Sequence, residues 1–325
     1  MLACLNNEIH LPPPSGQPRL PAIWVGGALF IHPLTNVRLC AIIRPAMGRR
    51  RSQAKSVSEL IEAYQRQYGR FALDYASNME AAYRHEKIPT GIERLDYLLG
   101  GGIPRGVFTE LYGTPGGGKT YVSLRAIASC QRAGGQAAYI DIERTYSPAF
   151  SAYCGVNPKE LLLSSPTDGE EALDIAVDLV RYGVDLVVLD SVAALVSGED
   201  LEKQVEVGGY APSVRLLNVG LAKLRASLGP GRPSAVILVN QVRENIGVMY
   251  GPRTTTPMGW RLKHDSALIL EVRRTEWIKK GDTRVGQVSM VRVEKTKVDG
   301  TLPVGSEVSI DISFPTVDDG SVGGY

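Results

Sequence analysis

The segment Gly113-Thr-Pro-Gly-Gly-Gly-Lys-Thr120 limits the possible folds of this chain more than any other feature. It matches the pattern G-x-x-x-x-G-K-[S/T], in which glycines let backbone N–H groups turn toward a phosphate group because no Cβ blocks them. Lys119 would add a mobile cation and Thr120 a hydroxyl group for Mg²⁺. The expected nucleotide-binding loop consists of Gly113, Thr114, Pro115, Gly116, Gly117, Gly118, Lys119 and Thr120.

The pattern around this loop predicts an α/β fold. A strand is expected at 106–112 and a helix at 121–133, on either side of the loop. Apolar strands are then predicted at 137–142, 161–164, 184–190 and 235–240, and helices at 167–183 and 212–229. After Ser266 the pattern changes to strands alone, at 267–273, 287–294 and 306–313. The chain therefore predicts a mostly parallel twisted sheet with helices on both faces and an antiparallel strand extension.

Composition is that of a globular protein with one large domain and appendages. Hydrophobic residues make up 44% of the 325 residues, and the net charge of +2 requires any nucleic-acid binding to come from a local patch. The four cysteines lack metal-binding spacing, so we expect reduced thiols in a cytoplasmic protein. No run of 18 apolar residues occurs, and we expect no membrane-spanning segment.

Three polar residues follow predicted strands at the edge where the phosphate loop must lie. Asp190 ends a buried strand, the position at which a carboxylate supports Mg²⁺ together with Thr120. Glu143 follows the strand at 137–142 and can orient and partly deprotonate a water molecule; the alternative is a solvated strand-end glutamate. Gln241 can hydrogen-bond a γ-phosphate without adding charge and is a candidate nucleotide sensor.

Two irregular segments are candidate binding loops. The segment 243–259 is too rich in Gly, Pro and Thr for a helix and too long for an ordinary connection. Its arginines suit phosphates, and its Met and Tyr suit the bases of a single strand; a lid over a small substrate is the rival interpretation. The segment 197–212 contains Gly209 and Tyr210 and leads into Arg215.

Together these motifs resemble the RecA recombinase family. Besides the phosphate loop, the resemblance rests on Asp190-Ser-Val-Ala-Ala-Leu195, Asn240-Gln-Val-Arg243, Ile246-Gly-Val-Met-Tyr-Gly251, Thr254-Thr-Thr256 and Lys295-Thr-Lys297. It extends from about Ser56 to Ile312 and implies a RecA-like P-loop ATPase core that uses ATP and Mg²⁺.

The resemblance also implies roles for single residues. It implies that Glu143 activates the attacking water and that Gln241 couples ATP to DNA. With Lys119 of the phosphate loop, these two residues are the candidate catalytic residues. Ser147 and Phe150 take the positions that hold the adenine, and Lys295 and Lys297 match a pair that reaches the γ-phosphate across a subunit interface. The implied DNA-binding residues are Gly209, Tyr210, Arg215, Arg243, Met249, Tyr250, Arg253, Thr254, Thr255 and Thr256.

The sequence departs from the family pattern at several points. The interior of the phosphate loop is unusual, Ser147 and Phe150 replace the usual Asp and Tyr, and Ala222 replaces a usual Arg. The second candidate loop has one residue fewer before its threonines and one more after them. The chain stops soon after the core, without the C-terminal domain and long acidic tail of the family. We therefore expect a phage or otherwise divergent recombinase.

Four segments are expected along the chain. Residues 1–53 are expected to be disordered or to include a mis-annotated start, with translation beginning at Met47; a real extension whose basic end contacts DNA is the alternative. Residues 54–88 would form an oligomerisation helix and linker, opened by the capping box Ser56-x-x-Glu59. Its apolar face would pack on a neighbouring subunit or on its own core. Residues 89–315 would form the RecA-like ATPase and DNA-binding core, and 316–325 a short flexible tail.

Three hypotheses follow for function. The leading one is a DNA-dependent ATPase that forms helical homo-oligomeric filaments on single-stranded DNA and pairs it with homologous duplex DNA. The second is an accessory ATPase that binds DNA or another filament without strand exchange. The third is a ring ATPase with the same fold outside recombination. DNA-stimulated hydrolysis, strand exchange by the purified protein, and filaments rather than rings in electron micrographs separate the three.

Overall fold

The computed structural model describes residues 24–25, 28–29, 56–195, 212–229, 234–244, 254–255 and 259–315. The chain divides into two compact units, residues 1–59 and 60–325. In the first unit, β1 (Trp24–Val25) pairs antiparallel with β2 (Ala28–Leu29). The predicted segments 1–53 and 316–325 lie almost wholly outside the described residues, so the predicted boundaries remain predictions.

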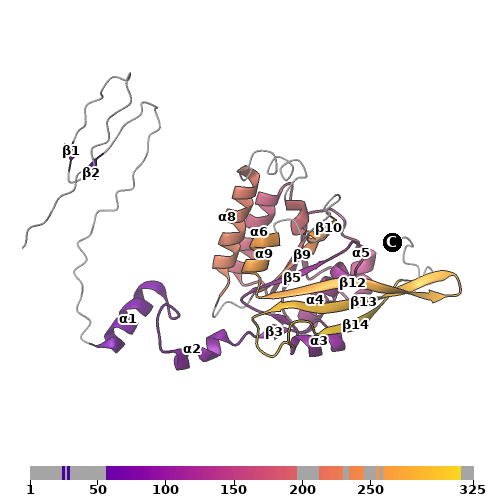
Figure 1. The fold of residues 1–325 in the computed structure, drawn as a ribbon, viewed down its shortest axis with the longest axis horizontal. Coiled ribbons are helices and arrows are strands. Elements are labelled where there is room, and N and C mark those ends of the chain that lie inside the picture. Colours follow the sequence, from indigo (N-terminus) through magenta and orange to yellow (C-terminus); the bar gives the residue numbers. More distant parts are fainter. Residues whose placement is uncertain are drawn as a thin grey trace, which may run out of the picture. The chain divides into compact units, whose positions relative to one another are not determined.

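A single eight-stranded sheet organises the second unit, in the order β14-β13-β12-β5-β9-β8-β6-β7 (Figure 1). From β12 to β7 all neighbours are parallel, whereas β12, β13 and β14 pair antiparallel. This arrangement confirms the predicted parallel sheet with an antiparallel extension. The strands are β5 (Phe108–Gly113), β6 (Ala137–Asp141), β7 (Leu161–Ser164), β8 (Leu186–Asp190), β9 (Ala235–Gln241), β12 (Leu268–Lys280), β13 (Thr283–Thr296) and β14 (Glu307–Ser313).

Helices cover both faces of this sheet because its central strands bury side chains on both sides. One apolar cluster joins α3 (Glu93–Leu99) and α4 (Lys119–Arg132) to one face. A second cluster joins α6 (Gly169–Tyr182), α8 (Pro212–Ser227) and α9 (Gly259–Asp265) to the other. Figure 1 shows these two groups on opposite sides of the strands. Among the described residues, none of the helices combines the length and apolar character needed to span a lipid bilayer.

Two predicted helices begin close to their expected positions. Helix α1 (Val57–Tyr68) follows Ser56, whose Oγ accepts a hydrogen bond from the N–H of Glu59 at 3.2 Å. Helix α6 begins one to two residues later than predicted, because Asp168 rather than Thr167 is its N-cap. The Asp168 carboxylate accepts from the N–H groups of Glu170 and Glu171, both at 2.9 Å. An Asp at the N-cap satisfies two helix donors that would otherwise lack a partner.

The antiparallel hairpin is longer than the sequence pattern predicted. Strand β12 was expected to end at residue 273 but continues to Lys280, and β13 begins at Thr283 rather than at residue 287. The two strands are joined by the two-residue turn Gly281-Asp282, and Gly281 has φ 64°. A glycine adopts this left-handed conformation without strain, so the turn can be tight.

The remaining elements are short. They are α2 (Ala76–Tyr83), β3 (Lys87–Ile88), β4 (Ile103–Pro104), α5 (Pro148–Tyr153), the 3₁₀ helix η1 (Val192–Leu195), β10 (Arg243–Glu244) and β11 (Thr254–Thr255). Strands β10 and β11 pair antiparallel, with Arg243 opposite Thr255. This pair places residues 243–244 next to residues 254–255.

Candidate nucleotide-binding and catalytic site

The predicted functional residues meet at the carboxyl edge of the parallel sheet. Gly113 ends β5, Asp190 ends β8 and Gln241 ends β9, and Glu143 follows the end of β6. Gly113 lies directly opposite Gln241, and Asp141 opposite Asp190, in the strand register. Parallel strands that end together place their following loops side by side, and ligands of open α/β sheets bind at this edge.

The glycines of the phosphate loop are required by close packing against β12 and β14. A Cβ on Gly113, whose φ is 154°, would stand 2.0 Å from the carbonyl oxygen of Val272. A Cβ on Gly118, with φ 106°, would stand 2.6 Å from Cδ1 of Ile312. A side chain at position 113 would collide with backbone of β12, and at position 118 the φ of 106° is strained for any residue other than glycine. Both positions therefore require glycine, in agreement with the phosphate-loop pattern of the sequence.

Lys119 is buried, and its ammonium group is held by the loop itself. Nζ donates hydrogen bonds to the carbonyl oxygens of Gly113 and Thr114, both at 2.9 Å. Burial lowers the pKa of Lys119, and the nearby carboxylates of Asp190 and Glu143 oppose that effect. The ammonium group thus stays within reach of the loop on which phosphates would bind.

Thr120 and Asp190 form a donor set suited to Mg²⁺. The Thr120 hydroxyl donates to Oδ2 of Asp190 at 3.0 Å, and the Tyr139 hydroxyl donates to the same oxygen at 2.7 Å. Burial raises the pKa of Asp190, and these two hydrogen bonds oppose the shift. Nowhere in the described segments do three or more His, Cys, Asp or Glu side chains gather as a metal cluster. Mg²⁺ commonly takes one or two carboxylates with substrate phosphates, so one Asp and one Thr fit such an ion.

Glu143 is fixed by two hydrogen-bond donors. Its Oε1 accepts from Nε2 of Gln241 at 2.7 Å and from the Ser191 hydroxyl. The turn that carries Glu143 is held by Asp141, whose carboxylate accepts from the N–H groups of Thr145 at 3.0 Å and Tyr146 at 2.8 Å. The candidate water-activating carboxylate and the candidate sensor are therefore in direct contact.

A buried carboxyl group lies behind the sensor. Glu110 is fully buried in β5, and its Oε1 accepts from Nδ2 of Asn240 at 2.9 Å. The Asn240 side chain in turn accepts from the N–H of Gln241 at 3.0 Å. Burial raises the pKa of Glu110. The hydrogen bond from Asn240 and the positive charges of Lys263 and Lys295 oppose this increase. Within the described part of the chain, Oε2 of Glu110 has no hydrogen-bond partner.

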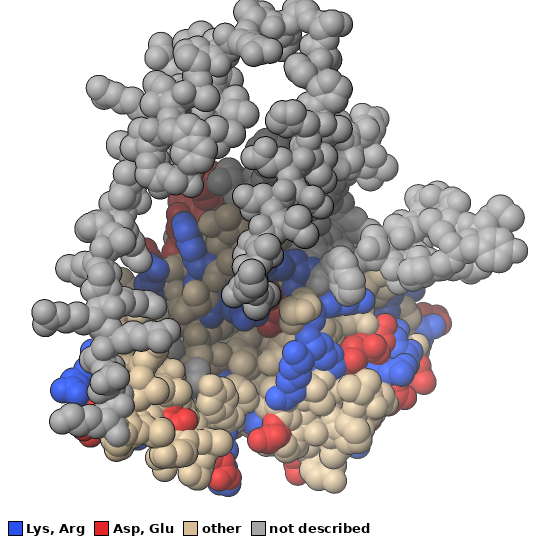
Figure 2. All heavy atoms as spheres, turned by 60° about the vertical axis from the view of Figure 1, so that its left-hand side comes forward, with Lys and Arg blue, Asp and Glu red and all other residues tan. Residues whose placement is uncertain are grey.

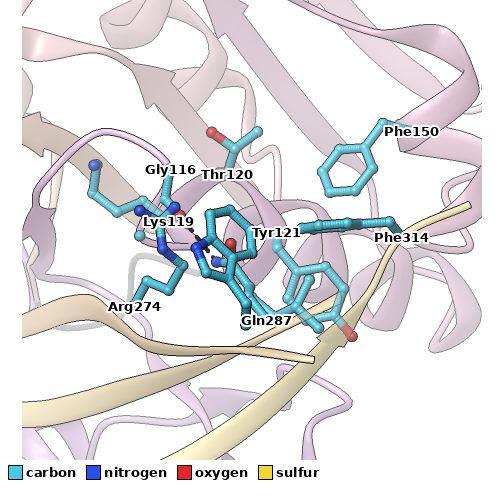
Figure 3. Close-up of a pocket in the computed structure, with 12 residues that line it drawn as sticks. Gly116, Lys119, Thr120, Tyr121, Phe150, Arg274, Gln287 and Phe314 are labelled. Atoms are coloured by element: carbon cyan, nitrogen blue, oxygen red, sulfur yellow. Dashed lines mark hydrogen bonds between the residues drawn. The ribbon is translucent and has the colours of Figure 1, made fainter. Parts of the chain in front are cut away.

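A pocket of about 260 Å³ lies along the phosphate loop. Figure 3 shows Lys119 and Arg274 toward one end of the view and the rings of Phe150 and Phe314 toward the other. A cationic end and an aromatic end match the two ends of a nucleotide. Phe150 was predicted to lie here. Ser147 does not line the pocket; it caps α5, and its Oγ accepts from the N–H of Phe150 at 3.3 Å.

The pocket also contains residues that the sequence analysis missed. Gln287 donates from Nε2 to the carbonyl oxygen of Gly116 at 2.9 Å and thereby ties β13 to the phosphate loop. Arg274 and Trp277 of β12, with Ile312 and Phe314 near the end of the described chain, complete the wall. These residues follow the phosphate loop by more than 140 positions in the chain. No sequence pattern predicts that they lie next to it.

The structure does not bring Lys295 and Lys297 into this pocket. Instead, Nζ of Lys295 donates to the carbonyl oxygens of Lys263 and His264 at the end of α9. Burial lowers the pKa of Lys295, and the charge of Lys297 adds to that effect. Their predicted role at a subunit interface remains a prediction.

Most predicted DNA-binding residues are not described. Gly209, Tyr210, Met249, Tyr250, Arg253 and Thr256 lie outside the described residues. For Arg215, Arg243, Thr254 and Thr255 the backbone is placed, in α8, β10 and β11. On the described part of the face in Figure 2, acidic and basic side chains are interspersed. The described part of this face therefore carries no uniform charge of one sign.

Comparisons with known proteins agree with this architecture. The model of the RecA N-terminal domain matches residues 55–316. Protein RecA of Oceanobacillus iheyensis is 44% identical over 229 residues, which cover 70% of this chain and 65% of that protein. Protein RecA of Bacillus subtilis is 46% identical over 233 residues, which cover 71% and 66%. Protein RecA of Symbiobacterium thermophilum is 40% identical over 265 residues, which cover 81% and 75%.

The chain therefore spans about two thirds of the length of several of the curated relatives it matches. The matched region contains the whole eight-stranded sheet and the site at its edge. A family match over this region, with relatives above 40% identity, leaves one assignment: the chain belongs to the RecA family.

Proposed function

We propose that the protein is an ATP-dependent recombinase that forms filaments on single-stranded DNA and pairs it with homologous duplex DNA. The observation that carries the proposal is the hydrogen bond between Gln241 and Glu143, which joins a candidate sensor to a candidate catalytic carboxylate. The relatives are named RecA, which supports the same activity for this chain.

In this proposal the loop and its neighbours bind ATP with Mg²⁺. The backbone of residues 113–118 and the ammonium group of Lys119 hold the phosphates, and Thr120 and Asp190 hold the ion, which offsets phosphate charge when bound. Phe150 packs against the base. Glu143 orients a water molecule toward the γ-phosphate and accepts its proton, as a carboxylate fixed by two donors can do.

Gln241 couples this chemistry to DNA. It is the last residue of β9, and β10 begins two residues later. A γ-phosphate that attracts the Gln241 amide would draw it from Glu143 and move the start of the segment 243–259. The proposed contacts of that segment to single-stranded DNA are made by Arg243, Met249, Tyr250, Arg253 and Thr254 to Thr256, with Gly209, Tyr210 and Arg215 from the preceding segment.

Assembly into a filament completes the site in this proposal. Lys295 and Lys297 would reach the γ-phosphate of the neighbouring subunit, so that hydrolysis depends on assembly. Helix α1 exposes Val57, Leu60, Tyr64 and Tyr68. Such an apolar face suits a contact with an adjacent protomer. The segment 54–88 is proposed to be this oligomerisation element, and 89–315 the core.

The deciding experiment measures ATP hydrolysis with and without single-stranded DNA, followed by strand exchange with the purified protein alone. We expect hydrolysis to rise at least tenfold with DNA and strand exchange to require ATP. Hydrolysis that ignores DNA contradicts the proposal. Stimulated hydrolysis and DNA binding without strand exchange would identify the accessory ATPase instead.

A further inference from the structure

Arg274 is a cation next to the phosphate loop, and it has no acidic partner among the described residues. Its neighbour Arg273 forms ion pairs with Glu271 at 4.0 Å and Glu307 at 3.7 Å. Arg274 forms no ion pair with any described residue, although it lines the same pocket as Lys119 and Thr120. Its Nη1 lies 3.2 Å from the point that a Cβ on Gly116 would occupy. A guanidinium group so placed is suited to an anion held by the loop.

Trp277 holds this guanidinium group in place. The Cζ atom of Arg274 lies 4.0 Å from the centre of the Trp277 ring, within the range of a cation–π contact. Arg284, from the opposite strand of the hairpin, also contacts this ring, with its Cζ at 4.5 Å. The ring meets Phe314 edge-on, with centroids 6.1 Å apart. Trp277 is thus fixed by the hairpin and by the aromatic end of the pocket.

Resting on the proposed ATP binding, we propose that Arg274 is a further phosphate-binding residue of the nucleotide site and that Trp277 is its positioning residue. The hairpin β12–β13 then supplies a phosphate contact within the same subunit, in addition to Lys119. Arg274 moves from the indole ring to the phosphates, or bridges both, while Gln287 keeps the loop next to β13.

The test compares Arg274→Gln with Arg284→Gln, because both remove a cation from Trp277 but only Arg274 lines the pocket. Affinity is measured by the fluorescence anisotropy of an N-methylanthraniloyl derivative of ADP, without DNA. We expect Arg274→Gln to raise Kd about tenfold. Arg284→Gln should change Kd less than about twofold, and Arg274→Lys should recover part of the loss.

A second measurement separates phosphate binding from nucleoside packing. Inorganic pyrophosphate is used to displace the labelled ADP. We expect Arg274→Gln to raise the Kd for pyrophosphate by a factor similar to that for ADP. Trp277→Phe should bind both ligands with nearly wild-type affinity. Trp277→Ala should bind both more weakly, because Arg274 loses the ring that positions it.

The outcomes distinguish this inference from the proposed function. If Lys119→Ala abolishes ADP binding but Arg274→Gln does not weaken it, or weakens it only as much as Arg284→Gln, the role of Arg274 is overturned while ATP binding stands. Weaker binding of ADP without weaker binding of pyrophosphate in Arg274→Gln also overturns it. A wild-type protein that binds neither ligand overturns both.

Discussion

The Gln241 amide donates a hydrogen bond to the Glu143 carboxylate, with 2.7 Å between Nε2 and Oε1. Two residues 98 positions apart are thereby joined at the edge of the sheet. A group that competes for the amide of Gln241 changes the surroundings of Glu143 at the same time. Under the proposed function, this one contact links the nucleotide state to the catalytic carboxylate.

Glu143→Gln should bind ATP but hydrolyse it slowly. Glutamine keeps an oxygen for the bonds from Gln241 and Ser191 but cannot accept a proton from water. We expect the DNA-stimulated kcat to fall at least about 100-fold, with nucleotide affinity within about threefold of wild type. Steady-state hydrolysis and nucleotide titrations measure the two effects. Glu170→Gln, an exposed glutamate in α6, is the control and should hydrolyse normally. Unchanged turnover in Glu143→Gln would rule out its role as a base.

Gln241→Ala should separate hydrolysis from DNA. The variant removes the donor that joins the end of β9 to Glu143. A movement of the candidate DNA-binding segment 243–259 can then no longer be transmitted to the Glu143 carboxylate. We expect the ratio of hydrolysis rates with and without single-stranded DNA to fall toward one. Gln136→Ala changes an exposed glutamine ahead of β6 and should keep the wild-type ratio. A full DNA response in Gln241→Ala would contradict the sensor assignment.

The substitution Glu110→Gln should raise the free energy of unfolding, relative to wild type, by an amount that grows as pH rises. Burial raises the pKa of Glu110 above its ordinary value of 4.5, so the unfolded chain releases this proton first. Stability from Glu110 is therefore present below pH 4.5 and is lost as pH rises through the folded-state pKa. Glutamine does not titrate, and the difference in free energy of unfolding, variant minus wild type, should grow between pH 4 and 8.

Urea denaturation at several pH values measures this difference. The matched control is Glu160→Gln, at an exposed position, for which we expect a smaller pH dependence of the same difference. A flat difference for Glu110→Gln would mean that the buried carboxyl group titrates as it does in the unfolded chain.

Leu60→Asp should prevent filament assembly without unfolding the core. Leu60 lies on the exposed apolar face of α1, with no buried residue in that helix, so a charge there costs little within one chain but much in an interface. Sedimentation and electron microscopy with DNA and a non-hydrolysable ATP analogue should show filaments for wild type and none for Leu60→Asp. Glu62→Ala, which removes the exposed ion pair with Arg66, should assemble normally. Normal filaments from Leu60→Asp would place the subunit contact elsewhere.

Much of the central fold was predictable because each strand or helix carries its own pattern. Strands such as β8 and β9 are continuous apolar runs, as burial on both faces requires, and the phosphate loop identifies the edge where they end. The polar residues Asp190 and Gln241 could be placed because each ends such a run. The order of the strands and their register follow from packing across the whole sheet and were not predicted.

Other features depend on contacts between distant residues. The extension of β12 to Lys280 was missed because Arg274 to Lys280 lack a clear apolar alternation, although Gly281-Asp282 is a recognisable hairpin turn. The helix start at Asp168 was missed because Thr167 and Asp168 are both good N-caps and only geometry selects one. Tyr139 and Ser191 were missed because only their hydrogen bonds to Asp190 and Glu143 reveal a role.

The hydrogen bond between Gln287 and Gly116 affects when the phosphate loop can fold during synthesis. These residues are 171 positions apart, and Gly113 packs against the carbonyl oxygen of Val272. The ribosome therefore releases the loop long before it releases the strands that hold it in shape. Contacts at such separation form late in folding. A nascent chain that ends before residue 287 should lack the contact that holds the phosphate loop against β13. Nucleotide binding would then begin only after these strands of the core have been synthesised and folded.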